Sequence, residues 1–301
     1  MEIESNTTED IDNQLLIPSI NYHLWAPCNM KCKFCFARFS DLREDILPKG
    51  HLSKEDAKNL VKKIIDAKFD KITFVGGEPT LCKWLDELII QSKEGGLTTM
   101  VVTNGSHLKE DWLNQVSQYL DWIVISIDSF DPATLIDMGR TVRNKPIEQE
   151  EYFKIATLVK KYGINLKINT VVTSSNYLED MSKQIIQLNP IRWKILQMLP
   201  IKGQNDDYSE EQKISIEQFD YFCKLNGEVS NNGIKVVKET NDLMLGSYVM
   251  IDPAGRFFDN TEGSYKYSKP ILEVGINDAL SEIKLDKSKF LQREGLYEWK
   301  K

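Results

Sequence analysis

A short stretch of the sequence, CNMKCKFCF, holds three cysteines whose spacing could do chemistry: Cys28, Cys32 and Cys35. Thiolates at such spacing bind zinc or an iron–sulfur cluster. Structural zinc usually takes four closed ligands, and His23 or His51 could supply the fourth. Three thiolates on a [4Fe–4S] cube instead leave one iron open, which can chelate a small molecule through an amine and a carboxylate. Three buried cysteines without any metal are the remaining alternative, which their crowding disfavours.

The composition excludes several classes of protein. The chain has 301 residues, of which 41% are hydrophobic, enough for one sizeable core. Its net charge of −7 does not invite nucleic acid, so an anionic ligand would need a local basic cluster. Three of the five cysteines are crowded into one short stretch, which indicates a reducing compartment rather than a disulfide framework.

The N-terminal segment, residues 1–16, is acidic and polar. It has no basic region followed by an apolar run, so we expect a flexible segment that is neither a signal peptide nor an amphipathic membrane helix. No apolar run in the chain reaches the length of a transmembrane helix. These features predict a cytoplasmic protein that does not bind a membrane.

Strand and helix patterns alternate along residues 17–229, which predicts an α/β domain with a parallel sheet and right-handed crossovers. The pattern suits a partial (βα)6 barrel or a doubly wound sheet. From about residue 230 the pattern changes to a hairpin around 253–255 and a loop-rich tail, so we expect 230–301 to be an extension packed on the barrel. The expected strands are 17–26, 71–75, 98–102, 122–127, 164–172 and 191–198, and helices are expected at 53–67, 81–93, near 108–118, 148–162 and 178–188.

Polar segments stand at the carboxyl ends of the second, third and fourth expected strands, where α/β folds place their sites. They are GGEP at 76–79, TNGS at 103–106 and SIDSF at 126–130. Each alone has a common alternative, because Gly-Gly and Asn-Gly make turns and Ser or Asp cap helices. Together, at successive strand ends and after the cysteines, they form a specific signal.

The motif CxxxCxxC followed by an aromatic residue resembles the signature of the radical S-adenosylmethionine superfamily. The resemblance implies a partial barrel, a [4Fe–4S] cluster on the three cysteines and S-adenosylmethionine on the open iron. One electron from the cluster then cleaves the cofactor to a 5′-deoxyadenosyl radical, which abstracts a hydrogen atom from the substrate. Glu78 would hold the cofactor's amino group. The residues that the resemblance places at the cofactor are Phe36, Gly76, Gly77, Glu78, Asn104, Ser126 and Asp128.

Charged residues interrupt the later strands at every second position. Lys167 and Asn169 share one strand face, and so do Arg192 and Lys194. Strands buried under helices should be continuously apolar, and Lys and Arg are rarely buried unpaired. Buried carboxylates could pair with them, but we favour an anionic ligand held by convergent cations. Several cations with an asparagine suit a polyphosphate, and Lys71 is a further candidate.

The chain resembles the prokaryotic members of the viperin family from about residue 18 to 299. The similar segments include NYHLWAPCNMKCKFCF, KITFVGGEPTL, KINTVV, RWKILQ, SYVMIDPAGRFF and KFLQREGLYEW. The resemblance implies conversion of a ribonucleoside triphosphate (CTP, UTP or GTP) to its 3′-deoxy-3′,4′-didehydro analogue, an antiviral chain terminator. The radical would take the hydrogen from the 4′ carbon of the sugar, and the 3′ hydroxyl would leave as water.

The same resemblance implies roles for individual residues and partners. Tyr248 would lie near the sugar and supply an electron or proton, and the extension would close over the active site, bringing Arg293 onto the nucleotide. An electron donor such as a flavodoxin or ferredoxin is implied, and we expect a monomer. The residues implied to contact the triphosphate or its sugar are Lys71, Lys167, Asn169, Arg192, Lys194 and Arg293.

The sequence departs from the animal members and leaves two rivals open. It lacks their N-terminal membrane helix and ends in EWKK rather than in the aromatic-terminated tail that recruits a cluster-assembly factor, so that partner is not expected. Another radical enzyme acting on a peptide or small metabolite is one rival, although no cysteine follows Cys223 for an auxiliary cluster. A non-enzymatic iron–sulfur or zinc module is the other. Cys82 and Cys223 lie on helical patterns, and we assign them no role.

Overall fold

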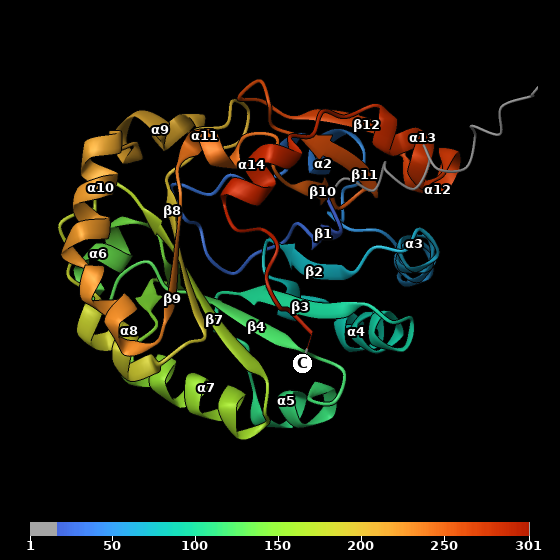
Figure 1. Cartoon of the computed structure of the whole chain (residues 1–301). Coiled ribbons are helices and arrows are strands. Elements are labelled where there is room, and N and C mark those ends of the chain that lie inside the picture. Colours follow the sequence, from blue (N-terminus) through green and yellow to red (C-terminus); the bar gives the residue numbers. More distant parts are fainter. Residues whose placement is uncertain (1–16, 301) are drawn as a thin grey trace, which may run out of the picture.

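A computed structural model describes residues 17–300, so the expected segment 1–16 lies outside the described residues. Ten strands form one sheet in the order β12-β11-β10-β1-β2-β3-β4-β7-β8-β9 (Figure 1). The two short strands β5 (Thr141–Val142) and β6 (Lys145–Pro146) form a separate hairpin. The strands of the large sheet are β1 (Ser19–Trp25), β2 (Lys71–Gly76), β3 (Thr98–Thr103), β4 (Trp122–Ser126), β7 (Asn165–Val172), β8 (Arg192–Gln197), β9 (Lys235–Glu239), β10 (Val249–Ile251), β11 (Arg256–Asp259) and β12 (Lys266–Pro270).

The longer helices follow the strands and cover the outer face of the curved sheet, as the ring of helices in Figure 1 shows. The helix α3 begins where the sequence predicts, because the Ser53 side chain accepts a hydrogen bond from the Asp56 amide at 3.1 Å. The helices are α2 (Ser40–Asp45), α3 (Lys54–Asp66), α4 (Leu85–Glu94), α5 (Glu110–Val116), α6 (Pro132–Asp137), α7 (Gln149–Lys161), α8 (Ser182–Leu188), α9 (Asp206–Gln212), α10 (Ile216–Leu225), α11 (Asn241–Met244), α12 (Ile271–Val274), α13 (Ile276–Ser281) and α14 (Lys287–Gln292), with 3₁₀ turns η1 (Pro79–Leu81) and η2 (Gly227–Asn232).

The predicted alternation of strands and helices is confirmed. The six predicted strands are β1, β2, β3, β4, β7 and β8, which lie side by side and pair in parallel. The sheet does not close, because β9 and β12 lie at its two edges. This open, curved parallel sheet is the partial barrel that the sequence indicated rather than a doubly wound sheet with helices on both faces.

Residues 230–301 contribute strands to both edges of the barrel sheet. The strand β9 pairs in parallel with β8, and β10 pairs in parallel with β1. The hairpin expected around 253–255 is present, since β10 and β11 are antiparallel with Ile251 opposite Phe257. The extension therefore shares the sheet with the barrel, with β9 at one edge and β10, β11 and β12 at the other.

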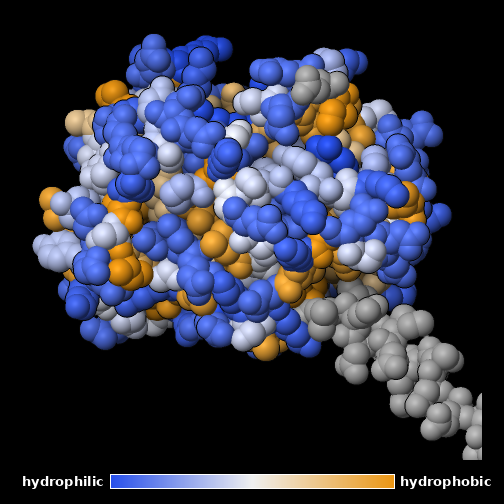
Figure 2. Space-filling model, turned by 90° about the horizontal axis from the view of Figure 1, so that it is seen from above, coloured by the Kyte–Doolittle hydropathy of each residue, from blue (hydrophilic) through white to orange (hydrophobic). Residues whose placement is uncertain are grey.

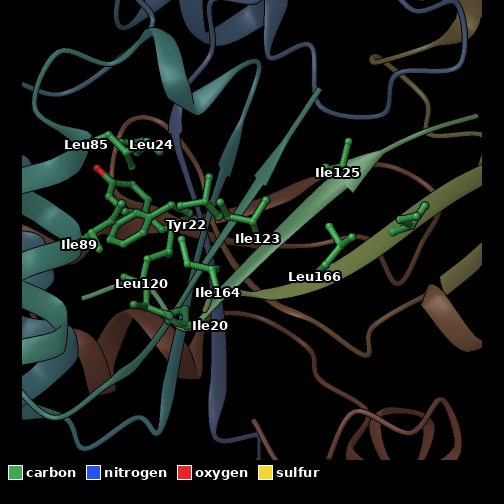
Figure 3. Packing of buried hydrophobic residues seen from close by; sticks show 14 of the residues in the cluster. Ile20, Tyr22, Leu24, Leu85, Ile89, Leu120, Ile123, Ile125, Ile164 and Leu166 are labelled. Carbon is green, nitrogen blue, oxygen red and sulfur yellow. The ribbon is translucent and has the colours of Figure 1, made fainter. Parts of the chain in front are cut away.

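The strands pack apolar side chains against the helices, and the predicted cations of β7 and β8 lie on the opposite, inner face. On β1, Ile20, Tyr22 and Leu24 pack in the main core, with Leu85 and Ile89 of α4 in the same cluster (Figure 3). The alternation of strand side chains puts the residues between them on the opposite face. Burial of each such side chain stabilises the fold by about 1.5–3 kcal/mol. Packing against the helices on the outer face therefore stabilises the sheet, and the residues of the inner face are free to form a binding site.

The face seen from above is predominantly hydrophilic, with separate hydrophobic patches scattered over it (Figure 2). Such scattered exposed apolar side chains are ordinary for a globular protein and indicate no large docking surface on this face. Within residues 17–300, no helix is both long enough and apolar enough to cross a membrane.

Candidate active site

The three predicted cluster ligands lie in the loop that follows β1, at the carboxyl end of the strand. Cys28 is exposed, whereas Cys32 and Cys35 are half-buried. The backbone of this loop is held from two sides, because the Ala26 amide donates to the Gly50 carbonyl at 2.9 Å and the Lys33 amide donates to the Met138 carbonyl at 3.0 Å. The loop is therefore anchored while its cysteines stay accessible.

The arrangement does not fit a structural zinc site. In the described part of the chain, no three His, Cys, Asp or Glu side chains are grouped so that they could hold a single metal ion. The ring of His23 lies among Phe36, Phe39 and Phe258, and burial lowers the pKa of His23 to about 3. The ring of His51 instead stacks on that of Trp25, with centroids 4.0 Å apart. Neither histidine completes a set with the cysteines.

Three cysteines without a fourth ligand fit a [4Fe–4S] cluster, whose bulk separates its cysteine sulfurs more widely than one ion does. The Met30 amide donates to Cys28 Sγ at 3.4 Å, and Arg140 Nη1 donates to Cys32 Sγ at 3.7 Å. Such donors stabilise thiolates and cluster sulfurs. Burial raises the pKa of Cys35 to about 12, so iron binding must displace its proton.

Gly76 and Gly77 are required by close approach to the chain that enters the cysteine loop. A Cβ at Gly76 would overlap the Trp25 carbonyl, and one at Gly77 would overlap the backbone carbonyls of Ala26 and Pro27. The sequence interpretation placed both glycines at the cofactor. The structure shows that they also allow the GGEP turn to lie directly against the cysteine loop, which no side chain would permit.

Glu78 is fully buried, and its carboxylate accepts several hydrogen bonds at the ends of β2 and β3. One oxygen accepts from the Thr80 amide at 3.0 Å and from the Thr103 hydroxyl at 2.7 Å, while the other accepts from the Asn104 amide at 2.8 Å. The Asn104 side chain then donates to Asn29 Oδ1 at 2.9 Å, inside the cysteine loop. Glu78 thus positions Asn104 against that loop, and its contact with the cofactor's amino group stays a prediction.

Arg140, which sequence reasoning missed, joins the ends of β4 and β7 to the cysteine loop. Its Nε lies 2.8 Å from Asp128 Oδ2, and its guanidinium also donates to the Ser126 carbonyl and to Cys32 Sγ. The carboxylate of Asp128 also accepts from the Val171 amide at 2.7 Å. Both expected residues, Ser126 and Asp128, therefore lie beside the cysteine loop. A basic residue soon after SIDSF was the available signal, but no periodicity distinguished it from a surface arginine.

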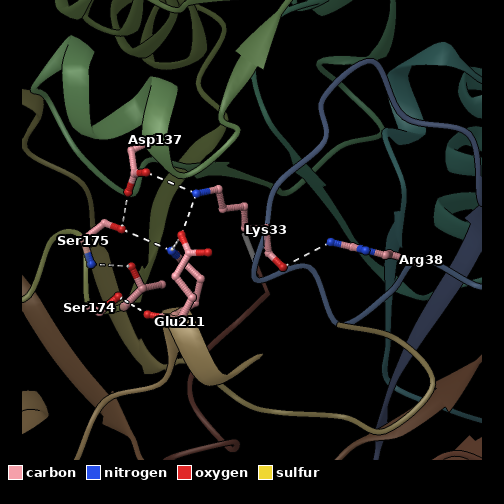
Figure 4. Close-up of polar contacts among 8 residues, drawn as sticks. Lys33, Arg38, Asp137, Ser174, Ser175 and Glu211 are labelled. Atoms are coloured by element: carbon pink, nitrogen blue, oxygen red, sulfur yellow. Dashed lines mark hydrogen bonds and ion pairs between the residues drawn. The ribbon is translucent and has the colours of Figure 1, made fainter. Parts of the chain in front are cut away.

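Lys33, which stands between two of the cysteines, ties their loop to two helix ends (Figure 4). Its Nζ lies 3.1 Å from Asp137 Oδ1 at the end of α6 and 2.6 Å from Glu211 Oε1 in α9. Ser175 donates to Asp137 at 2.7 Å, and Arg38 donates to the Lys33 carbonyl at 3.2 Å. These contacts fix the cysteine loop against α6 and α9.

The predicted cations converge on the inner face of the sheet. The register places Lys167 beside Arg192 and Asn169 beside Lys194 on β7 and β8. Lys71 begins β2, and its pKa is lowered well below its ordinary value by burial and by the charges of Lys194 and other cations. The positive groups therefore lie close enough to repel one another, as expected for a site that awaits an anion.

Glu239 is a carboxylate that the sequence analysis did not single out. It is fully buried at the end of β9 and forms ion pairs with Lys194 and with Arg293, the latter at 3.4 Å. Tyr248 donates its hydroxyl proton to Glu239 and accepts a hydrogen bond from Lys194 Nζ at 3.1 Å. Burial would raise the pKa of Glu239, but Lys194 and Arg293 lower it to about 2. The side chain is therefore ionised at neutral pH.

The alternative of buried carboxylate partners is met for only part of the cluster. Within residues 17–300, neither Lys71 nor Lys167 has an Asp or Glu within ion-pair distance, and Arg192 reaches only the half-exposed Glu294 at 3.8 Å. Burial lowers the pKa of Lys167 well below its ordinary value, and the neighbouring lysines add to this effect. Three buried atoms of this cluster have no hydrogen-bond partner among residues 17–300, namely Asn169 Oδ1, Arg192 Nε and Arg293 Nε. Unsatisfied polar groups facing unpaired cations indicate a missing polar ligand.

The cofactor residues and the cations meet on adjacent strands. Ser126, at the carboxyl end of β4, lies opposite Asn169 of β7 in the register. Phe36 is 40% exposed, and the edge-to-face contact of its ring with His23 keeps it beside the cysteine loop. The register therefore brings the predicted cofactor residues next to the predicted cations on the inner face.

Comparison with known proteins agrees with this geometry. The model of the Radical SAM superfamily matches residues 25–183. A protein of Flammeovirga pacifica, named S-adenosylmethionine-dependent nucleotide dehydratase, is 47% identical over 285 residues, covering 95% of this chain and 97% of that protein. A protein of the same name from Lacinutrix mariniflava is 50% identical over 284 residues, covering 94% of this chain and 59% of the longer relative.

A solved structure described as native anSMEcpe with bound AdoMet shares the fold. Its TM-score is 0.66 at 16% identity, with 91% of this chain and 82% of that chain covered. The superfamily match confirms the expected cofactors, a [4Fe–4S] cluster and S-adenosylmethionine, and together with the two relatives it confirms the prediction of an enzyme. The chain belongs to the radical S-adenosylmethionine superfamily and, within it, to the viperin-like S-adenosylmethionine-dependent nucleotide dehydratases.

Proposed function

We propose that the protein converts a ribonucleoside triphosphate, with CTP, UTP or GTP as the candidates, to its 3′-deoxy-3′,4′-didehydro analogue. The observation that carries the proposal is the set of buried cations on the inner face, of which Lys71 and Lys167 have no carboxylate partner among residues 17–300. A single carboxylate would not occupy so many positive groups, whereas a triphosphate offers several charged oxygens to charge-assisted hydrogen bonds. A peptide substrate would leave these cations unpaired.

The chain's own residues would bind and orient the substrate, and this positioning is their contribution to catalysis. When bound, the cluster and S-adenosylmethionine supply the radical that takes the 4′ hydrogen. The cations would hold the triphosphate so that the sugar lies below the cysteine loop, near Ser126 and Asn169. Tyr248 points its hydroxyl at Glu239 and Lys194 on the same face, which makes it a candidate for the final electron or proton.

The function is tested with the anaerobically reconstituted protein, dithionite and S-adenosylmethionine. CTP, UTP, GTP and ATP are offered separately, and 5′-deoxyadenosine and nucleotide products are followed by mass spectrometry. We expect 5′-deoxyadenosine to rise with one or two nucleotides, each giving a product lighter by one water. Cofactor cleavage that ignores every nucleotide would remove the proposed substrate and leave the superfamily assignment intact.

Nucleotide binding is expected to take up protons and to weaken as the pH rises. Burial and neighbouring cations lower the pKa of Lys194 to about 8 and the pKa values of Lys71 and Lys167 well below their ordinary range. A bound triphosphate raises these pKa values. At a pH above the lowered pKa values of the free enzyme, the complex therefore holds more protons than the free enzyme does. The affinity should therefore fall as the pH rises from neutrality, with Lys194 adding to the fall above about 8.

Calorimetry at pH 8 in two buffers of different ionisation heat measures this uptake directly, because the terminal phosphate is already ionised there. The variant Lys194→Met should bind about ten- to a hundredfold more weakly at pH 7 and lose the part of the pH dependence above 8. A binding heat that is independent of the buffer would contradict the expectation. The electron donor, the monomeric state and the cytoplasmic location stay predictions.

A further inference from the structure

The chain that follows α14 returns across the inner face of the barrel. In Figure 1 this red segment runs from α14 past β2 and β3 to the C-terminal end of the chain. Its far end is fixed at the start of β4, where Trp122 Nε1 donates to the Trp299 carbonyl at 2.8 Å. The residues just before the end therefore lie at the amino ends of the strands, opposite the cysteine loop.

Two aromatic rings of this segment lie against three cations of the inner face. Lys71 Nζ is 4.4 Å from the centroid of the Trp299 ring and 5.0 Å from that of Tyr297. The Arg192 guanidinium lies 4.0 Å from the Tyr297 centroid, and Lys167 Nζ lies 5.8 Å from it. The two aromatic rings meet edge to face with centroids 5.5 Å apart. One aromatic pair thus contacts every cation of the cluster that lacks a buried carboxylate partner in the described chain.

A π face stabilises a cation differently from a carboxylate. Its attraction is modest at an exposed site and reaches about 2 kcal/mol where water is excluded, but it does not neutralise the charge. Lys194 is paired with Glu239 and must exchange partners when an anion binds, whereas Lys71 and Arg192 have no buried carboxylate partner to release among the residues that the structure describes. Trp299 is 6% exposed, so these contacts are sheltered from water.

The position of the two aromatic rings indicates which phosphate of the nucleotide would lie nearest to them. The reacting sugar must lie toward the cysteine loop, at the carboxyl ends of the strands, so the phosphate chain extends toward their amino ends. Lys71 and Arg192 are the first residues of β2 and β8. We propose that Tyr297 and Trp299 form the floor of the polyphosphate site, holding Lys71, Lys167 and Arg192 for the terminal phosphate and so selecting triphosphates over diphosphates. This inference rests on the proposed function.

The test replaces each of the two aromatic rings by an apolar side chain that has no π face. Binding of CTP, CDP and inorganic triphosphate is measured by calorimetry for the wild type, Trp299→Leu, Trp299→Phe and Tyr297→Leu. Leucine removes the π face, so we expect CTP and inorganic triphosphate to bind about five- to thirtyfold more weakly, with CDP changed less than about threefold. Phenylalanine keeps a π face and should stay within about threefold of the wild type. Trp112→Leu, on α5, is the matched control and should bind as the wild type does.

The outcomes separate this inference from the function on which it rests. A Trp299→Leu protein that binds CTP as tightly as the wild type, or loses CTP and CDP equally, would overturn the floor. Wild-type protein that binds no polyphosphate at all would instead overturn the proposed substrate. Turnover adds a second readout, because loss of the floor in Trp299→Leu should raise the KM for the nucleotide while leaving kcat within about threefold of the wild type. If Trp299→Leu does not fold, Tyr297→Leu decides by the same criteria.

Discussion

Replacing Cys32 by alanine is expected to abolish reductive cleavage of S-adenosylmethionine. Two thiolates cannot hold a [4Fe–4S] cluster that already leaves one iron without a protein ligand, and Cys32 also carries the contact with Arg140. The iron content of the reconstituted protein and the absorption of the cluster should fall to background, together with 5′-deoxyadenosine formation. The measurement is an anaerobic assay with dithionite, with iron determined on the same sample.

The chain offers matched controls for this experiment. Cys82 and Cys223 are buried free thiols that do not lie in the cysteine loop. Cys82→Ala and Cys223→Ala should retain the cluster and cleave the cofactor at close to the wild-type rate. Cofactor cleavage that survives in Cys32→Ala would show that the cluster is held elsewhere, and loss of iron in either control would show that the assay reports folding instead.

Replacing Glu239 by glutamine is expected to destabilise the free protein by about 3–5 kcal/mol, because it leaves buried cations without their counter-charge. Lys194 and Arg293 both pair with this carboxylate, and Tyr248 donates to it. Glutamine keeps the volume, so the loss reports charge rather than a cavity. A bound triphosphate supplies the missing negative charge, so the nucleotide should stabilise the variant more than it stabilises the wild type.

Denaturant titrations with and without CTP measure both effects. The control is Glu211→Gln, which removes a carboxylate that is 53% exposed and pairs with Lys33. An ion pair at such exposure contributes about 0–1 kcal/mol, so this variant should unfold almost as the wild type does. A Glu239→Gln protein that is as stable as the wild type, with no additional gain from CTP, would contradict the assignment of Glu239 as the internal counter-ion of the phosphate cations.

Local patterns in the sequence predicted the frame of the site. The cysteine loop could be predicted because its three cysteines lie in one short segment directly after β1. The GGEP turn reaches this loop because glycine alone permits so close an approach. The alternation of side chains along a strand predicted that Lys167 and Asn169 share one strand face and that Arg192 and Lys194 share another, without any knowledge of strand pairing. Parallel pairing of β7 with β8 then brings the two faces together.

The partners of these residues could not be predicted in the same way, because they come from distant segments. Glu239 follows an ordinary strand, and nothing in its sequence shows that it meets Arg293 of the tail. Arg140 shows no periodic signal, although it joins Asp128 to the cysteine loop. Contacts of this kind depend on loop paths, which local propensity does not determine.

The sequence by itself indicated the chemistry of the protein, through the predicted cluster ligands, the predicted cofactor turns and a row of cations too polar for buried strands. Only the tertiary structure decided how these cations are balanced. It gives Lys194 a carboxylate and places Lys71 against two aromatic rings, which belong to a tail whose contact with Trp122 spans 177 residues. The reason is physical. The residue types that can bind a cluster or an anion are set by their chemistry and can be read from the sequence. The environment of a buried charge instead depends on which distant segments the packed chain brings to it.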